Sequence, residues 1–241
     1  MTFSPDLFAG RHVLVVGATS GIGAGIAAAF AAHGASVVVT GASAADVERR
    51  ASSVGAAAVL DVRDGAAVRA VVDGLPELDV VVNCAGVIRR GEEHDPAVFA
   101  EVIDINLVGM QRVCTAARSR LAGRGGSIVN LASMLSFFGG GLVPAYSASK
   151  GGVAQLTKSL AIAYAGDGIR VNAVAPGWIA TPLTQALQDD PARSAPILGR
   201  TPLGRWGTPD DVTGPVLFLC SAAAAFVTGV VLPVDGGYLI T

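Results

Sequence analysis

The chain has 241 residues, a formal net charge of −2, 51% hydrophobic residues and 15% charged residues. This balance excludes a disordered chain, and the lack of a basic cluster argues against nucleic acid as a partner. The longest apolar run, at 215–227, is too short to cross a membrane and is broken by Ser221, so we expect no membrane partner.

Short apolar runs rich in β-branched residues alternate with alanine-rich stretches. Runs that are apolar throughout predict strands buried on both faces. In chain order, the predicted strands cover 13–16, 37–40, 59–60, 79–82, 127–131, 170–175 and 230–234, and the predicted helices cover 23–33, 44–53, 66–74, 96–122, 145–165 and 210–221. The alternation predicts an α/β fold: a doubly wound parallel sheet (Rossmann fold) in three layers, forming a single domain over residues 1–241.

One stretch, residues 182–209, differs from its surroundings because it is rich in proline and arginine. Segments of this kind often lie on the surface and carry function, so we expect a lid over the binding site.

Cysteine content and the first residues of the chain bear on location. Cys84, Cys114 and Cys220 are odd in number and form no CxxC pair, which argues against a disulfide framework or a zinc site. Residues 1–11 lack the charged and apolar regions of a signal peptide. We therefore expect a cytoplasmic protein without a metal.

The first predicted strand runs directly into a glycine pattern, with Gly17, Gly21 and Gly23 spaced as GxxxGxG before a helix. Glycines there permit a sharp turn, a close approach of the backbone to a pyrophosphate, and tight packing of the helix on the sheet. The helix N-terminus would present free N–H groups to the anion, with Ser20 as a cap or phosphate donor. An ordinary tight turn is the alternative, but the flanking strand and helix favour a dinucleotide site.

The second predicted strand ends in the run Thr40, Gly41, Ala42 and Ser43. An acidic residue at this place reads the ribose 2′-hydroxyl of NAD, and a nearby arginine accommodates the 2′-phosphate of NADP. Neither is present. Because a 2′-phosphate would lack a cation, the sequence favours NAD over NADP unless Arg63 turns toward the ribose.

Tyr146 and Lys150 are spaced i and i+4, which places them on one face of a helix. An ammonium beside a phenol lowers the pKa of the phenol and makes it a usable general acid or base, although an incidental pair is the alternative. Ser133 follows a predicted strand, where open α/β sheets bind ligands. Asn106 lies in an apolar helical stretch, so its amide needs buried partners, either structural ones or those of a polar relay.

Together these features resemble the short-chain dehydrogenase/reductase family in its short, single-domain form. The family's motifs occur in order over essentially the whole chain: GATSGIG at 17–23, DV at 61–62, NCAG at 83–86, Asn106, Ser133, YSASK at 146–150 and PGWIAT at 176–181. Two positions depart from the usual pattern. Val16 replaces a threonine before the first glycine, which implies a less rigid loop, and Cys84 replaces an asparagine, where we expect a structural effect.

The resemblance implies a role for each matching residue. Tyr146 would exchange a proton with the substrate oxygen, and Lys150 would lower the pKa of Tyr146 and bind the nicotinamide ribose. Ser133 would polarise the carbonyl, and Asn106 would hold a water of the proton relay. The cofactor, NAD or NADP, would lie along Gly17, Ser20, Gly21, Ile22, Gly23, Asp61, Val62, Asn83, Ala85, Gly86, Tyr146, Lys150, Pro176, Gly177, Ile179 and Thr181.

The implied activity is an NAD(P)-dependent interconversion of a secondary alcohol and a ketone. The runs VIRRG at 87–91 and GRTPLGRWGTPDD at 199–211 resemble members that act as gluconate 5-dehydrogenase and 2-deoxygluconate 3-dehydrogenase, so we expect a sugar or sugar acid as the small-molecule substrate. Arg89 and Arg90 could clamp its carboxylate or simply form a solvated basic pair.

Several alternatives remain open from the sequence. A reductase of 3-oxoacyl thioesters or of general carbonyls suits the apolar residues that we expect to wall the pocket, namely Met134, Phe137, Phe138, Trp178 and Leu183. A nicotinamide sensor without turnover is disfavoured because Tyr146 and Lys150 are both present. A sugar-nucleotide epimerase would resemble a longer chain. The resemblance also implies a homotetramer, formed through the helices predicted at 96–122 and 145–165 and the C-terminal segment.

Overall fold

A computed structural model describes residues 3–50 and 54–241 and contains one sheet of seven strands in the order β3-β2-β1-β4-β5-β6-β7. All six neighbouring pairs are parallel. The strands are β1 (His12–Val16), β2 (Ser36–Gly41), β3 (Ala56–Val59), β4 (Val80–Asn83), β5 (Ser127–Leu131), β6 (Arg170–Pro176) and β7 (Val231–Val234).

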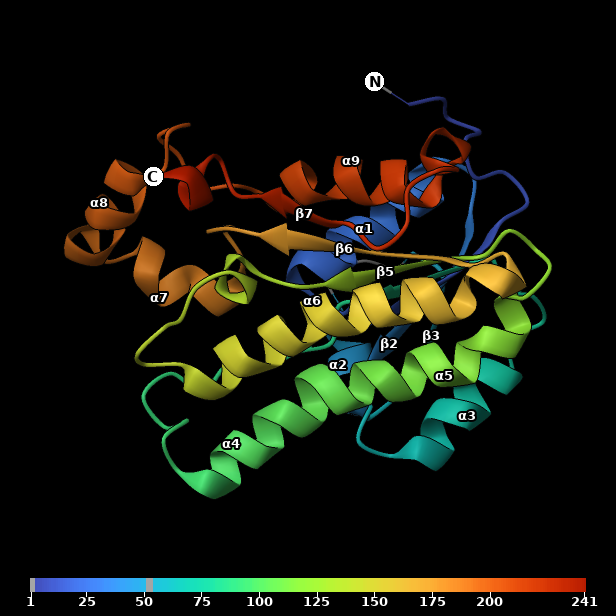
Figure 1. The fold of residues 1–241 in the computed structure, drawn as a ribbon, viewed down its shortest axis with the longest axis horizontal. Helices are drawn as coiled ribbons and strands as arrows, with labels where there is room; N and C mark the ends of the chain where they lie inside the picture. The colour runs from blue at the N-terminus through green and yellow to red at the C-terminus, as the bar shows by residue number, and fades with distance from the viewer. Residues whose placement is uncertain (1–2, 51–53) are drawn as a thin grey trace.

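Helices cover both faces of this sheet (Figure 1). One core lies between the sheet and α1 (Gly21–Ala32) with α9 (Pro209–Cys220), and it takes up Val13 and Val15 of β1. The other core lies under α3 (Gly65–Asp73), α5 (Met110–Leu121) and α6 (Pro144–Tyr164), and it takes up Leu14 and Val16. Because successive side chains of a strand point to opposite faces, one apolar run fills both cores. The predicted three-layer, doubly wound architecture is confirmed.

Three predicted elements differ from the structure by more than a shift of one or two residues at their ends. β3 covers Ala56–Val59 rather than 59–60, because its alanines give no β-branched signal. The helix predicted at 44–53 is α2 (Ala44–Glu48), and residues 51–53 lie outside the described part of the chain. The single helix predicted at 96–122 is divided into α4 (Pro96–Ile103), a π-helical segment (Asp104–Gly109) and α5.

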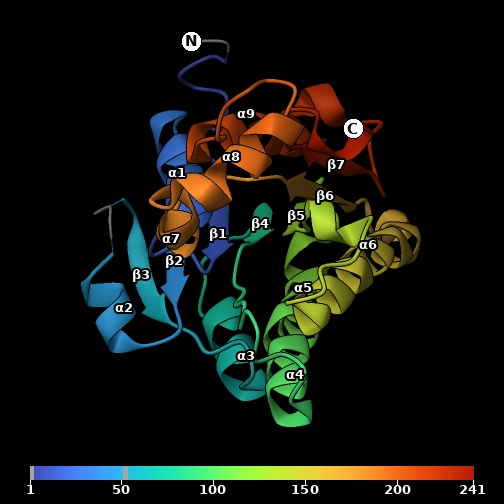
Figure 2. The same ribbon diagram turned by 90° about the vertical axis from the view of Figure 1, so that its left-hand side faces the viewer.

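The predicted lid segment, residues 182–209, contains a short turn of 3-10 helix (Pro182–Thr184), α7 (Gln185–Gln188) and α8 (Pro191–Arg200). Pro182 and Pro191 start helical turns, where a missing N–H is tolerated. α7 and α8 lie at the edge of the sheet where the strands end, which faces the viewer in Figure 2. Among the described residues, no helix has the length and apolarity that a membrane span requires.

Candidate active site

The strand order reverses between β1 and β4, and open α/β sheets bind ligands at the carboxyl ends of strands at such a point. Gly17 follows β1 with φ +77°, and a Cβ placed on it would lie 2.5 Å from the main-chain nitrogen of Ala85, which follows β4. Only glycine therefore lets the two loops meet. The contact between the loops after β1 and β4 forms the floor of the candidate site, and it leaves no room for a Cβ on Gly17.

The glycine loop is tied to the neighbouring strand β2 through Thr40. The main-chain N–H of Gly17 donates to Thr40 Oγ1 at 3.2 Å, and that of Ala18 donates to the Thr40 carbonyl at 3.0 Å. Thr40 thus supplies a hydroxyl that Val16 lacks, and the expected loss of rigidity does not follow. Ser20 occupies the N-cap of α1 and makes no capping hydrogen bond with its side chain, so the first turn of α1 keeps its N–H groups for an anion.

The loop after β6 reaches the glycine loop from the other side. A Cβ on Gly21 would lie 3.5 Å from Thr181 Cγ2, so the motifs at 17–23 and 176–181 are in contact although they are far apart in sequence. A Cβ on Gly177 would lie 2.7 Å from Asp235 Cα, so glycine also allows the loops after β6 and β7 to pack closely. Ile179 is buried below them. A dinucleotide could lie between the two motifs.

Asp61 and Val62 follow β3 toward the same edge of the sheet. Arg63 is bound to Asp61, with Nη2 donating to Oδ2 at 2.7 Å and Nε donating to both oxygens at 3.0 Å. These bonds are the largest cause that lowers the pKa of Asp61. Arg63 is therefore paired with Asp61 rather than turned toward the end of β2. Val62 is buried against Gly109.

The structure brings Tyr146, Lys150 and Ser133 together at the carboxyl end of β5. Lys150 Nζ lies 5.5 Å from the centre of the Tyr146 ring and donates to the Leu131 carbonyl at 2.5 Å. The hydroxyl of Ser133, two residues after β5, lies close enough to the Tyr146 phenol to lower the pKa of that phenol. Gly86 closes the group, since a Cβ there would lie 3.8 Å from Lys150 Nζ.

The pKa values of this group differ from our prediction. We expected Lys150 to lower the pKa of Tyr146, but burial raises it, and the Glu93 carboxylate raises it further while the Ser133 hydrogen bond lowers it. The Lys150 ammonium lies over the ring and is itself buried, which lowers its own pKa to about 8. Burial disfavours the charged form of both groups and is the largest cause of both shifts.

Asn106 lies in the π-helical segment and is fully buried. Its Nδ2 donates to the Val87 carbonyl at 2.9 Å and to Ser149 Oγ at 3.2 Å, while its Oδ1 accepts from the Val87 N–H at 2.8 Å. Both hydrogens of the Asn106 side-chain amide are used in these bonds. A water near Asn106 would therefore have to donate a hydrogen bond to its side-chain or main-chain carbonyl oxygen. A π-helical turn in an α-helix is common at functional sites.

Asn83 ends β4, and its side chain enters a buried polar network rather than the loop above. Its Nδ2 donates to Asn130 Oδ1 at 2.9 Å, and Asn130 in turn donates to Thr157 Oγ1 of α6 at 3.0 Å. The network links β4, β5 and α6 below the candidate site. The Asn83 side chain therefore connects β4 and β5 to the helix α6.

A cluster of aromatic side chains lies beneath the lid segment. The Trp178 ring is 5.8 Å from that of Trp206 and 6.3 Å from that of Tyr238, and Phe138 is 6.2 Å from Tyr238. The Arg200 guanidinium lies 4.2 Å from the centre of the Tyr238 ring. Of the expected walls, Phe138 and Trp178 belong to this cluster and Met134 is buried, whereas Phe137 and Leu183 are exposed. Sequence reasoning missed the contributions of Trp206, Tyr238 and Arg200, because only the fold brings them together.

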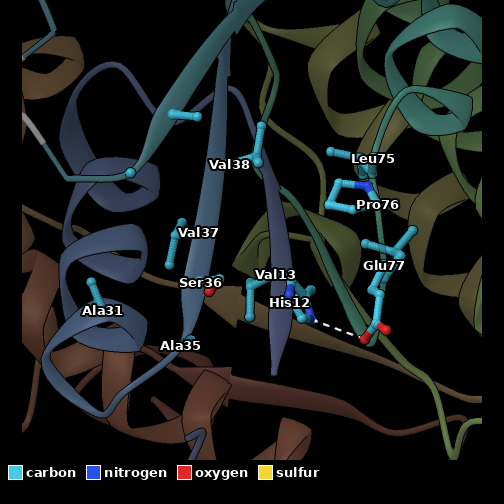
Figure 3. A pocket seen from close by; sticks show the side chains of 13 residues that line it. His12, Val13, Ala31, Ala35, Ser36, Val37, Val38, Leu75, Pro76 and Glu77 are labelled. Atoms are coloured by element: carbon cyan, nitrogen blue, oxygen red, sulfur yellow. Dashed lines mark ion pairs between the residues drawn. The ribbon is translucent and has the colours of Figure 1, made fainter. Parts of the chain in front are cut away.

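A second hollow, of about 540 Å³, lies at the opposite edge, where β1, β2 and β3 begin (Figure 3). His12 Nδ1 lies 3.4 Å from Glu77 Oε2 and 3.5 Å from Asp79 Oδ2. These groups are close enough to share a metal ion, but Arg124 pairs with Glu77 at 2.7 Å and Arg11 pairs with Asp79 at 3.1 Å. We assign the cluster to a structural network of ion pairs.

Known proteins are similar to this chain in sequence and in fold. A family model described as enoyl-(acyl carrier protein) reductase matches residues 17–239. A 2-dehydro-3-deoxy-D-gluconate 5-dehydrogenase from Pseudoalteromonas atlantica is 42% identical, covering 95% of this chain and 96% of its own. An Agrobacterium tumefaciens protein solved with bound NADP is 42% identical with a TM-score of 0.89, covering 99% of this chain and 100% of its own. A gluconate 5-dehydrogenase from Burkholderia cenocepacia, solved with NADP and tartrate, is 35% identical with a TM-score of 0.90, covering 98% of both chains.

Proposed function

The chain belongs to the short-chain dehydrogenase/reductase family and acts on a CH–OH group with NAD(P), and we propose that its substrate is a sugar acid. The observation that carries the proposal is the meeting of Tyr146, Lys150 and Ser133 beside the glycine loop. Relatives that match almost the whole chain and act on gluconate derivatives support the substrate class.

The cofactor would lie between the glycine loop and the loop after β6. Gly17, Gly21 and the N-terminus of α1 would hold its pyrophosphate, while Thr181 and the buried Ile179 would border the nicotinamide. When bound, the nicotinamide accepts a hydride from the substrate carbon or returns one to it. This role fits the glycine loop, because Gly17 carries no side chain and packs directly against the main chain of Ala85.

The protein's own residues would handle the proton. In oxidation, the Tyr146 phenolate takes the proton of the substrate hydroxyl while Ser133 donates a hydrogen bond to the same oxygen. In reduction, Tyr146 returns that proton to the oxygen of the former carbonyl. Lys150 lies next to Gly86, where a ribose would pass. Fixing these groups in advance lowers the barrier by position and electrostatics.

A carboxylate of the substrate would bind Arg90. Arg89 pairs with Glu101 of α4 at 3.5 Å, whereas Arg90 is exposed and makes no ion pair with any described residue. Both follow β4 at the carboxyl edge of the sheet. An arginine fork can bind a carboxylate with two parallel hydrogen bonds, and the unpaired guanidinium of Arg90 is available for it.

Within NAD(P), we propose a preference for NAD. Asp46 Oδ2 accepts hydrogen bonds from the N–H of Ser43 at 3.1 Å and from its hydroxyl at 2.7 Å, so a carboxylate stands at the end of β2. A 2′-phosphate would find neither Arg49 nor Arg63 unpaired there, because Arg49 pairs with Asp46 at 3.3 Å and Arg63 is held by Asp61. We expect tighter binding of NADH than of NADPH in fluorescence titrations. Asp46→Asn should narrow the difference, while Arg63→Gln should leave it unchanged; a wild-type preference for NADPH would contradict the proposal.

We also propose a homotetramer in the cytoplasm. Ile162 on α6 is 81% exposed, and Ile240 near the C-terminus is 86% exposed, so two separate surfaces carry large apolar side chains. Two isologous interfaces are enough to build a tetramer. The three cysteines are free thiols, which suits a reducing compartment. Light scattering should give a tetramer for the wild type and a smaller assembly for Ile162→Lys.

The substrate assignment is tested by turnover with a panel. Gluconate and 2-dehydro-3-deoxygluconate should be turned over with nicotinamide cofactor, and a 3-oxoacyl thioester should be a poor substrate. Tyr146→Phe should lower turnover by about 1,000-fold while NADH fluorescence still reports binding. Tyr164→Phe, at the far end of the same helix, is the control and should retain activity. Preferred turnover of the thioester would overturn the substrate class, and an active Tyr146→Phe would overturn the acid/base role.

A further inference from the structure

Glu93 is a fully buried carboxylate in the loop between β4 and α4. Its Oε1 accepts from the Arg89 N–H at 2.8 Å, and its Oε2 accepts from the Tyr146 N–H at 2.8 Å. Among the described residues, no cation lies within ion-pair distance of it. A buried charge without a cation is costly, so its place calls for an explanation beyond packing.

The bond to Tyr146 caps the helix that carries the candidate catalytic pair. Tyr146 is the third residue of α6, and the N-cap residue, Val143, offers no side-chain acceptor. The N–H groups of a first turn lack partners within the helix and sit at its positive end. Glu93 supplies the missing acceptor, with a full negative charge, from a different part of the chain.

The same loop is held to Tyr146 at a second point. The Ser149 hydroxyl donates to the Tyr146 carbonyl at 2.7 Å and accepts from Asn106, which in turn holds both main-chain groups of Val87. The N–H and the carbonyl of Tyr146 are thus both linked to the loop 87–93, one through Glu93 and the other through Ser149 and Asn106. This loop carries Arg89 and Arg90.

Two further bonds dock the loop on the segment that precedes α6. The Gly91 N–H donates to the Leu142 carbonyl at 2.8 Å, and His94 Nε2 lies 3.0 Å from the Gly141 carbonyl oxygen. Both lie at the surface, whereas Glu93 lies in the interior. Of these three contacts made by residues 91–94, the one made by the buried Glu93 carboxylate is the one that reaches Tyr146 itself.

We propose that Glu93 is a positioning residue for the reaction, which fixes Tyr146 relative to the arginine-bearing loop that receives the substrate. The proposal rests on the proposed function, because it takes Tyr146 as the acid/base group. Position matters at this site, since a displacement of the acid/base group by about 1 Å can cost 100-fold in rate.

The charge of Glu93 also acts on the Tyr146 phenol. The groups that face this phenol are Ser133 from the end of β5, Lys150 from α6 and Glu93 from the loop after β4. Burial is the largest cause that raises the pKa of Tyr146, and the negative charge of Glu93 raises it further. Removing that charge should lower the pKa of Tyr146. Loss of an uncharged helix cap would not change this pKa through charge.

The experiment compares Glu93→Gln with Glu92→Gln, an exposed neighbour that loses the same charge. The ionisation of Tyr146 is followed by ultraviolet absorbance, as the difference between each protein and the same protein carrying Tyr146→Phe. This readout needs no substrate, so it stays informative if the sugar-acid assignment fails. Turnover and NADH binding are measured in parallel.

We expect Glu93→Gln to move the Tyr146 titration to lower pH by about one unit or less, and to lower kcat about 10-fold or more with NADH binding retained. Glu92→Gln should match the wild type. Glu93→Asp keeps the charge, but its shorter side chain would not reach both N–H groups. The Tyr146 titration should therefore stay as in the wild type, while turnover should be lost. An unchanged Tyr146 titration with unchanged kcat in Glu93→Gln would overturn the proposal. Should that variant fail to fold, wild-type turnover by Glu93→Asp would overturn it.

Discussion

At the scale of the residue, the buried ammonium of Lys150 links stability to pH. Burial lowers its pKa to about 8 from 10.5, so between these values the unfolded chain binds a proton that the folded protein has released. The contribution of Lys150 to the free energy of unfolding therefore rises as pH increases from 8 to 10.5 and is lowest below 8. The gap corresponds to a cost of about 3 kcal/mol at neutral pH.

Lys150→Met should consequently raise stability at pH 7 while it abolishes turnover. We expect a gain of about 2 kcal/mol, because the Leu131 carbonyl loses its donor and offsets part of the relief. Denaturant unfolding at pH 7 and at pH 10.5 measures it, and the gain should shrink at the higher pH. A variant less stable than the wild type at pH 7 would contradict the assigned cost.

Candidate site residues that belong to a recognisable sequence motif could be predicted from the sequence. Residues that reach the site only through contacts between distant segments could not. Tyr146 and Lys150 share a helix, so their i, i+4 spacing was enough to place them on one face. Glu93 reaches Tyr146 from 53 residues away, and its run GEEHDP reads as a solvated loop. The pKa of Tyr146 was predicted in the wrong direction because the extent of burial cannot be read from spacing.

At the scale of the element, the π-helical segment depends on a close contact that only glycine allows. A Cβ on Gly109 would lie 2.5 Å from Cγ2 of the buried Val62, which follows β3. β-Branched side chains have few rotamers with which to avoid such a clash. The contact sets how near the segment carrying Asn106 lies to the sheet.

Gly109→Ala should destabilise the protein by about 1 to 3 kcal/mol, since overpacking a filled core costs this much. Gly151→Ala is the matched control, because Gly151 also lies inside a helix but a Cβ there meets nothing within 4 Å. The control should be neutral or stabilising by up to about 1 kcal/mol. Thermal unfolding of both variants tests this, and equal stabilities would show that Val62 yields without cost.

Strands and helices with strong periodic signals were predicted close to their limits, and weak or interrupted ones were not. β5 was predicted residue for residue because it is rich in apolar residues and directly preceded by two glycines. The π-helical segment within 96–122 keeps the composition of a helix, so no pattern marks it. The helices of the lid segment were hidden by prolines, which start helical turns as readily as they end helices.

At the scale of the whole molecule, the proposed cofactor site joins elements from both halves of the sheet. Gly17 packs on Ala85, and Gly21 contacts Thr181 on the loop after β6. A ligand that binds between them should therefore stabilise the folded state as a whole. At a concentration 100 times its Kd, it would add about 2.7 kcal/mol to the free energy of unfolding.

NADH should raise the thermal midpoint, by about 5 to 10 °C for a domain of this size. Gly17→Ala should lose this shift, because its Cβ would collide with Ala85. Gly10→Ala is the control, since Gly10 has a similar φ of +73° but meets nothing within 4 Å. Both variants carry the cost of a left-handed conformation and Gly17→Ala adds the collision, so the comparison uses the shift that NADH produces in each variant. If NADH raised the thermal midpoint of Gly17→Ala as much as that of the wild type, the assignment of the glycine loop to the cofactor site would be contradicted.

The aromatic cluster under the lid segment has a spectroscopic consequence. The chain has two tryptophans, Trp178 and Trp206, and their rings stand at 77° to each other with centres 5.8 Å apart. Trp206 belongs to the lid segment and Trp178 lies at its base. All of the protein's indole emission therefore originates in this one corner, so the unlabelled enzyme would report any rearrangement of residues 182–209 on its own. Energy transfer from these indoles to bound NADH would gauge how near the lid comes to the nicotinamide.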